Sequence, residues 1–188
     1  MPQSPASPTS RTALLVIDAQ ESFRQRPFWR DDDLAVYFER QQALIDGAVA
    51  RGVPVVQVFH VSAGAFARES GFVRTLEELR IDPTFTLDKT KHSALAGSTL
   101  GAWLVQHGTT RLIVSGIRTE QCCETTARAA SDAGYAVDFV TQATLTFPMT
   151  HPRTKRELSV AELKERTETV LVDRFARIVT VEEALAAV

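Results

Sequence analysis

Cysteine is scarce in this sequence: there are two residues among 188, Cys122 and Cys123, and they are adjacent. Neighbouring cysteines cannot join distant segments, which argues against a disulfide-stapled secreted domain and favours a reducing compartment. No apolar run approaches the roughly 20 residues that a membrane-spanning helix needs. The opening MPQSPASPTS lacks the apolar core of a signal peptide, and it predicts a disordered tail over residues 1–10. We therefore expect a cytoplasmic protein.

An excess of charge of one sign is also missing. The chain has 21 Lys and Arg against 23 Asp and Glu, a formal net charge of -2. Without a basic field, we expect no nucleic-acid partner and no membrane partner. What is present is 44% apolar residues, which is typical of a globular domain. Residues 11–188 are expected to form one such domain and to bury about two-thirds of the unfolded chain's surface.

Apolar runs and helical periodicity alternate along the chain. A possible short strand opens an irregular connection at 84–98, and residues 69–80 fit either a helix or a loop. Thr180 and Glu183 form a capping box at the start of the last helix. The predicted strands are 12–18, 53–60, 111–116, 135–143 and 174–180, and the predicted helices are 34–52, 99–108, 119–134, 159–172 and 180–188.

Strands separated by helices predict a three-layer α/β/α fold. Its sheet would be mainly parallel and Rossmann-like, with helices on both faces. Ligands of such sheets bind outside the carboxyl ends of the strands. Asp18 ends the first strand, and Gly116 and the two cysteines follow a later one. These residues could therefore share one edge of the sheet.

The adjacent cysteines allow two interpretations. A cysteine in the first turn of a helix feels the positive end of the helix dipole, which lowers its thiol pKa and favours a nucleophile. Neighbouring helical residues point about 100° apart, so the two thiols cannot face one pocket. Cys123 shares a stripe with Ala127 and Ala130 that suits packing on the sheet, which weakly favours Cys122 as the exposed thiol. The alternative is two small buried residues at a close helix–sheet crossing.

Three segments resemble the isochorismatase-like cysteine hydrolases. LLVIDAQESF is similar to the family's opening strand, which ends in Asp-x-Gln. DKTKHSALAGSTL is similar to its Lys-x-x-x-Ser-Ala segment, and LIVSGIRTEQCCETTARAA to its Gly-x-x-Thr-x-x-Cys run. The resemblance implies that Cys122 is the nucleophile, Asp18 its base and Lys89 the accompanying amine. Cys123 then occupies a position that is usually small and apolar.

The resemblance also implies a reaction and an assembly. It suggests a metal-independent hydrolase that cleaves an amide, ureido or carbamoyl C–N bond of a small molecule through a thioester. A cis peptide is expected between Ile117 and Arg118, with the backbone N–H groups of Arg118 and Cys122 forming the oxyanion hole. Relatives are commonly dimers or tetramers, so a homo-oligomer is expected.

Departures from the family pattern affect the pocket. Nicotinamidases in the family bind a metal through an aspartate and histidines after the second strand, whereas this chain has a single histidine there, His60. We therefore expect no metal and no cofactor. Arg118 could pair with a substrate carboxylate or point to solvent. Phe23 and Trp29 could wall the pocket or form a satellite cluster, and Ile117 and His60 complete the expected substrate contacts.

Other functions stay open on the sequence alone. A catalytically silent binding protein on the same fold is one, although it would have no chemical need for Asp18, Lys89 and Cys122 together. Isochorismatase-type vinyl-ether hydrolysis is another, but those relatives lack the cysteine. A redox-sensing thiol is a third. The loop at 147–158, with two prolines and no periodicity, could be a lid or an oligomer contact.

Overall fold

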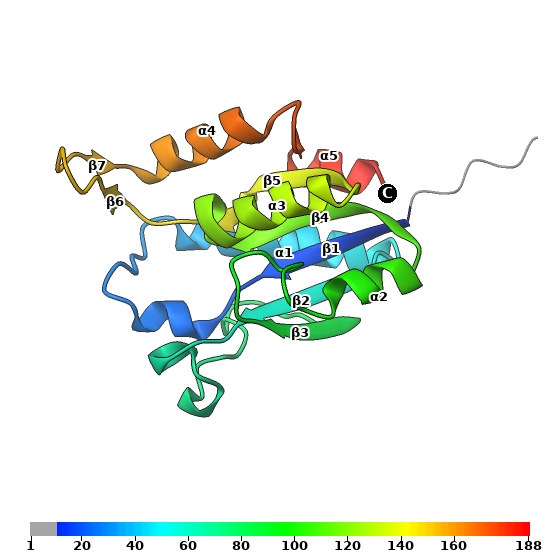
Figure 1. Ribbon diagram of the computed structural model, residues 1–188, viewed down its shortest axis with the longest axis horizontal. Coiled ribbons are helices and arrows are strands. Elements are labelled where there is room, and N and C mark those ends of the chain that lie inside the picture. The colour runs from blue at the N-terminus through cyan, green and yellow to red at the C-terminus, as the bar shows by residue number, and fades with distance from the viewer. Residues whose placement is uncertain (1–10) are drawn as a thin grey trace, which may run out of the picture.

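The computed structural model describes residues 11–188, in which a six-stranded sheet lies between layers of helices (Figure 1). The predicted tail, residues 1–10, lies outside the described residues. All neighbouring strands of this sheet are parallel, which confirms the predicted fold class. In spatial order the strands are β3 (Phe85–Lys89), β2 (Val55–His60), β1 (Arg11–Ile17), β4 (Thr109–Ile117), β5 (Ala136–Leu145) and β8 (Arg177–Ile178).

Helices bury both faces of the sheet. Successive residues of β1 point to opposite faces, so this strand contributes side chains to two cores. Leu14 and Val16 pack in one core with α1 (Leu34–Ala50) and α5 (Val181–Ala186). Leu15 and Ile17 pack in a second core with α2 (Leu100–Gln106), α3 (Glu124–Asp132) and α4 (Val160–Leu171). The continuous apolar run of β1 is thus typical of a central parallel strand. No helix within residues 11–188 is long and apolar enough to cross a membrane.

Helix ends follow the local sequence closely. The predicted capping box of Thr180 and Glu183 is present at α5, and Ser159 with Glu162 forms a second one at α4. In each box the hydroxyl accepts the N–H of the glutamate, and the glutamate accepts the N–H of the capping residue. Short-range hydrogen bonding of this kind is readable from sequence.

Three segments differ from their predicted structure, and two that the sequence left open are decided. Of these two, residues 69–80 are mostly loop, with a 3-10 turn at Arg68–Ser70, and the possible short strand that opens the irregular connection is the edge strand β3. The predicted helix over 119–134 begins as a π-helical turn, Thr119–Cys123, before α3. The loop at 147–158 contains a small hairpin, β6 (Met149–Thr150) with β7 (Glu157–Leu158). The last strand is shortened to two residues, because only Arg177 and Ile178 pair with β5.

Candidate active site

The candidate site lies at the carboxyl ends of four neighbouring strands. Ile17 of β1 is opposite Val58 of β2 and Gly116 of β4, and His60 is opposite Lys89 at the end of β3. The residues that follow or end these strands therefore meet at one edge, as expected for a parallel sheet. They are Lys89, His60, Asp18 and Cys122.

Gly116 allows β4 to approach β1 closely just before the site. Its φ is +119°, and a Cβ atom at this position would overlap the backbone carbonyl of Ile17. A residue with a side chain would meet both an unfavourable backbone conformation and rigid backbone atoms. The glycine of the Gly-x-x-Thr-x-x-Cys run is therefore required by packing of the strands.

We predict that Gly116→Ala lowers the free energy of unfolding by about 3 kcal/mol or more, because overpacking and a positive φ act together. Gly101→Ala is the matched control: nothing lies within 4 Å of its added Cβ on α2. Alanine there should raise helix stability by roughly 0.5–1 kcal/mol. Urea denaturation of both variants measures the difference, and equal stabilities would contradict this explanation of Gly116.

Asp18, Lys89 and Cys122 form a buried contact group. The Lys89 Nζ atom lies 2.8 Å from Asp18 Oδ2, and neither side chain of this pair is exposed. The same ammonium lies 3.4 Å from Cys122 Sγ. Apart from Lys89 and the thiol, no hydrogen-bond donor within residues 11–188 reaches the Asp18 carboxylate. The carboxylate can therefore receive the thiol proton.

Burial dominates the electrostatics of this group. It raises the pKa of Asp18, although the positive charge of Lys89 opposes the shift. Burial, assisted by the negative charge of Asp18, raises the pKa of the Cys122 thiol to about 12. This direction is opposite to the one expected from the helix start, because burial and the charge of Asp18 outweigh the opposing charge of Lys89. Cys122 is a thiol at neutral pH and needs a base.

Two histidines flank the group, of which the sequence interpretation included only His60. Gln20 holds the backbone of His60: its Oε1 accepts the His60 N–H at 2.8 Å, and its Nε2 donates to the His60 carbonyl at 3.1 Å. His60 Nδ1 lies 3.2 Å from the Lys89 ammonium. On the other side, His92 Nδ1 lies 4.0 Å from Cys122 Sγ. The Gln of the Asp-x-Gln motif thus joins the ends of β1 and β2.

His60 is predicted to make stability depend on pH. Burial, with the charges of Lys89 and His92, lowers its pKa from 6.5 to about 4. The unfolded chain then takes up a proton between pH 6.5 and pH 4 that the folded protein does not bind, so stability falls as pH falls through that range. Because the ring is only half-buried, the loss is on the order of 1–2 kcal/mol.

Urea denaturation at pH 7 and pH 4.5 measures this effect. His60→Gln should lose less stability than the unmodified protein over the same interval, since glutamine does not titrate. Identical losses for the two proteins would show that His60 is not the group responsible.

The turn after β4 places the two cysteine side chains in different environments. The peptide bond between Ile117 and Arg118 is cis, and the Arg118 carbonyl accepts the N–H groups of Gln121 and Cys123. Cys123 is fully buried in the second core with Ala127 and Ala130. Cys122, 6% exposed, lines a cavity. One thiol therefore packs while the other reaches a pocket.

That cavity has a volume of about 240 Å³. Its lining includes Asp18, His60, Cys122, His92 and Gln121. Two loops supply the remaining lining residues: the segment after β1 contributes Phe23, Arg26 and Phe28, and the segment after β2 contributes Ser62, Ala63 and Phe66. Phe66, Arg26 and His92 were not found from the sequence, because each lies in a loop without a pattern that marks its direction.

Three of the expected substrate contacts lie outside this cavity lining: Trp29, Ile117 and Arg118. Trp29 packs on Phe147 with ring centroids 5.1 Å apart. Ile117 is fully buried in the first core. The Arg118 guanidinium is 3.1 Å from Glu120 Oε1 and donates to the Phe147 carbonyl at 3.1 Å. Arg118 is thus neither solvent-pointing nor free, since its charge is already paired inside the protein.

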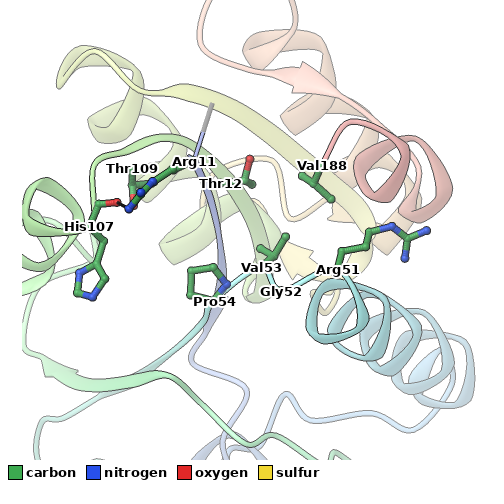
Figure 2. Close-up of a pocket in the computed structure, with 9 residues that line it drawn as sticks. All are labelled: Arg11, Thr12, Arg51, Gly52, Val53, Pro54, His107, Thr109 and Val188. Carbon is green, nitrogen blue, oxygen red and sulfur yellow. Dashed lines mark hydrogen bonds between the residues drawn. The ribbon is translucent and has the colours of Figure 1, made fainter. Parts of the chain in front are cut away.

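A larger cavity, of about 380 Å³, lies at the opposite end of the sheet. Figure 2 shows Arg11, Thr12 and Thr109 there, at the beginnings of β1 and β4, with Val188 nearby. Its lining contains no cysteine, carboxylic side chain or lysine. It contains a histidine, His107, but lacks the thiol nucleophile and the carboxylate of the Cys122 cavity. Within residues 11–188, no group of three or more His, Cys, Asp or Glu residues is arranged to hold a metal ion.

Comparison with known proteins places these features in a family. The model of the Isochorismatase domain matches residues 12–183. The uncharacterized isochorismatase family protein YrdC of Bacillus subtilis (strain 168) is 22% identical over 179 residues, covering 93% of this chain and 95% of that protein. A shorter match to nicotinamidase 3 of Arabidopsis thaliana is 35% identical over 79 residues, which is 42% of this chain and 40% of that protein.

Solved structures agree with this fold. A proposed isochorismatase from Burkholderia xenovorans LB400 superimposes with a TM-score of 0.85 at 29% identity, covering 95% of this chain and 88% of that one. A cysteine hydrolase from Pseudomonas syringae pv. phaseolicola 1448A gives a TM-score of 0.84 at 23% identity, with coverage of 98% and 95%. At that identity the second match speaks for the fold alone.

Proposed function

Because the chain belongs to the isochorismatase family, a family of hydrolases, we propose that it is a cysteine hydrolase that cleaves an amide, ureido or carbamoyl C–N bond of a small molecule. One observation carries the proposal. The Lys89 ammonium contacts both Asp18 and Cys122, at 2.8 Å from the carboxylate and 3.4 Å from the sulfur, beside a cavity that admits a small ligand.

In the first step, the Cys122 thiol gives its proton to Asp18 and the sulfur attacks the carbonyl carbon of the substrate. Lys89 stabilises the thiolate and keeps the carboxylate in position. The carbonyl oxygen becomes an oxyanion, which the backbone N–H groups of Arg118 and Cys122 stabilise. Their place in the turn that carries the nucleophile supports this role.

In the second step, the C–N bond breaks and the leaving amine takes the proton from Asp18. The product at this stage is a thioester between Cys122 and the acyl group. Water then attacks the thioester, with Asp18 accepting its proton, and the free acid leaves as the thiol re-forms. No group other than water and the substrate is consumed.

An ammonia-release screen tests the proposal. The panel contains primary amides, ureides and carbamoyl amino acids. Each compound that carries a carboxylate is paired with its methyl ester. Nicotinamide is included because of the partial nicotinamidase match. Turnover by the protein and its loss in Cys122→Ala are expected. No turnover of any compound would favour the binding-protein alternative, and equal turnover by Cys122→Ala would remove Cys122 from the mechanism.

A further inference from the structure

The ionisable groups around the candidate cavity differ in whether they have a partner of opposite charge. Asp18 is paired with Lys89, and His60 stays neutral above a pKa of about 4. Arg26 also lines the cavity, yet no carboxylate within residues 11–188 lies in ion-pair range of its guanidinium. The cavity is therefore left with one uncompensated positive group.

Other arginines near the cavity have their charge satisfied. Arg24, two residues earlier, pairs with Glu21 and with Glu78. Arg118 is buried and pairs with Glu120. Arg26 differs from both in being exposed and in lining the same cavity as Cys122. Among residues 11–188 no carboxylate pairs with it, so its N–H donors are available for a ligand.

The position of Arg26 is held by its own loop. Its backbone N–H donates to the Phe23 carbonyl, and its carbonyl accepts the Trp29 N–H, both at 3.0 Å. Its guanidinium carbon lies 5.8 Å from the centre of the Phe28 ring. A guanidinium positioned against an aromatic ring keeps its planar set of N–H donors available for a carboxylate.

We propose that Arg26 binds a carboxylate of the substrate, so that the natural substrate is a small amide or ureide that carries a carboxylate away from the scissile C–N bond. This inference rests on the proposed hydrolase function. Phe23 and Phe66, whose rings meet edge to face at 5.0 Å, line the same cavity and would contact the apolar segment that joins the two groups. At about 240 Å³ the cavity is smaller than the roughly 300–1,000 Å³ that drug-sized ligands occupy, which limits this segment to a few atoms.

The test compares each carboxylate compound of the panel with its methyl ester. Arg26→Gln should raise KM for the carboxylate by about 10- to 100-fold with kcat nearly unchanged, because a charge-assisted contact made equally in ground and transition states is lost. KM for the ester should not change. Arg26→Lys should recover part of the carboxylate preference. Arg30→Gln, which removes the same charge from an exposed position of the same loop outside the cavity lining, should leave both values unchanged.

Binding to the Cys122→Ala protein separates this inference from the hydrolase function. Succinamate should bind more tightly than methyl succinamate in titration calorimetry, and adding Arg26→Gln should abolish the difference. If that result accompanies a failed activity screen, the hydrolase proposal is wrong, and of the Arg26 proposal only carboxylate binding stands, without the amide or ureide substrate. If amides are hydrolysed but Arg26→Gln affects carboxylate and ester alike, or neither, the Arg26 proposal is wrong. Equal binding of the two compounds to Cys122→Ala overturns it as well.

Discussion

Cys122→Ala is expected to lower kcat by about 10⁴- to 10⁶-fold, because removing a covalent nucleophile leaves only binding and the oxyanion donors. Cys123→Ala is the matched control, since it deletes the same atom from the neighbouring residue. Cys123 is fully buried against Ala127 and Ala130 and does not line the cavity. We expect the Cys123 variant to keep kcat within about threefold and to lose stability on the order of 1 kcal/mol.

Acid quenching and mass spectrometry provide the direct measurement. During turnover, the peptide that contains both cysteines should gain the mass of the acyl group. The adduct should persist in Cys123→Ala and be absent from Cys122→Ala. An adduct on Cys123, or full turnover by the Cys122 variant, would contradict the assignment of the nucleophile.

Asp18→Asn is expected to lower kcat at pH 7 by about 10²- to 10⁴-fold, the usual contribution of a general base. The physical reason is the Cys122 thiol, whose pKa of about 12 leaves it protonated at this pH. The amide of asparagine cannot accept the proton. Because the charge of Asp18 raises the thiol pKa while Lys89 lowers it, the variant's thiol should titrate below the value in the unmodified protein.

Residual activity of Asp18→Asn should consequently rise about tenfold per pH unit on the acid side of that lowered pKa, because thiolate must form before the substrate is attacked. Measurement of kcat/KM between pH 6 and pH 10 reveals the slope. A flat profile, or a rate equal to that of the unmodified protein, would show that Asp18 is not the base.

Stability needs a separate measurement in this variant. Lys89 is buried and loses its carboxylate, a change that typically costs about 3–5 kcal/mol when one partner of a buried pair is removed. Near-UV circular dichroism and urea denaturation give the folded fraction, and rates are then expressed per folded molecule. Lys89→Met leaves a carboxyl group whose pKa is already raised by burial, so we expect the protonated Asp18 to be tolerated better than the unpaired lysine.

Much of the architecture could be predicted from local pattern. The apolar run before Asp18 and the one before Gly116 each form a central strand, and the capping box at Thr180 forms as expected. The edge strand β3 was harder to recognise, because only two of its five residues are buried and one of these is a lysine, Lys89. Residues 69–80 were ambiguous for a similar reason: their apolar side chains pack as a loop on the first core.

The sequence by itself determined which residues end the central strands, and hence that Asp18 and the turn carrying Cys122 would meet at one edge, whereas Lys89 was placed there only by the family resemblance and reaches it from the edge strand β3. Strand endings depend on short-range periodicity and turn residues, and parallel pairing brings their carboxyl ends together. Tertiary structure decided which of these groups are charged and which cations are free. Burial set the protonation of Cys122, and contacts with Glu120 and Phe147 occupied Arg118, while Arg26 at the cavity has no ion-pair partner within residues 11–188. Desolvation and ion pairing depend on segments that meet only in the folded protein, so no local pattern reports them.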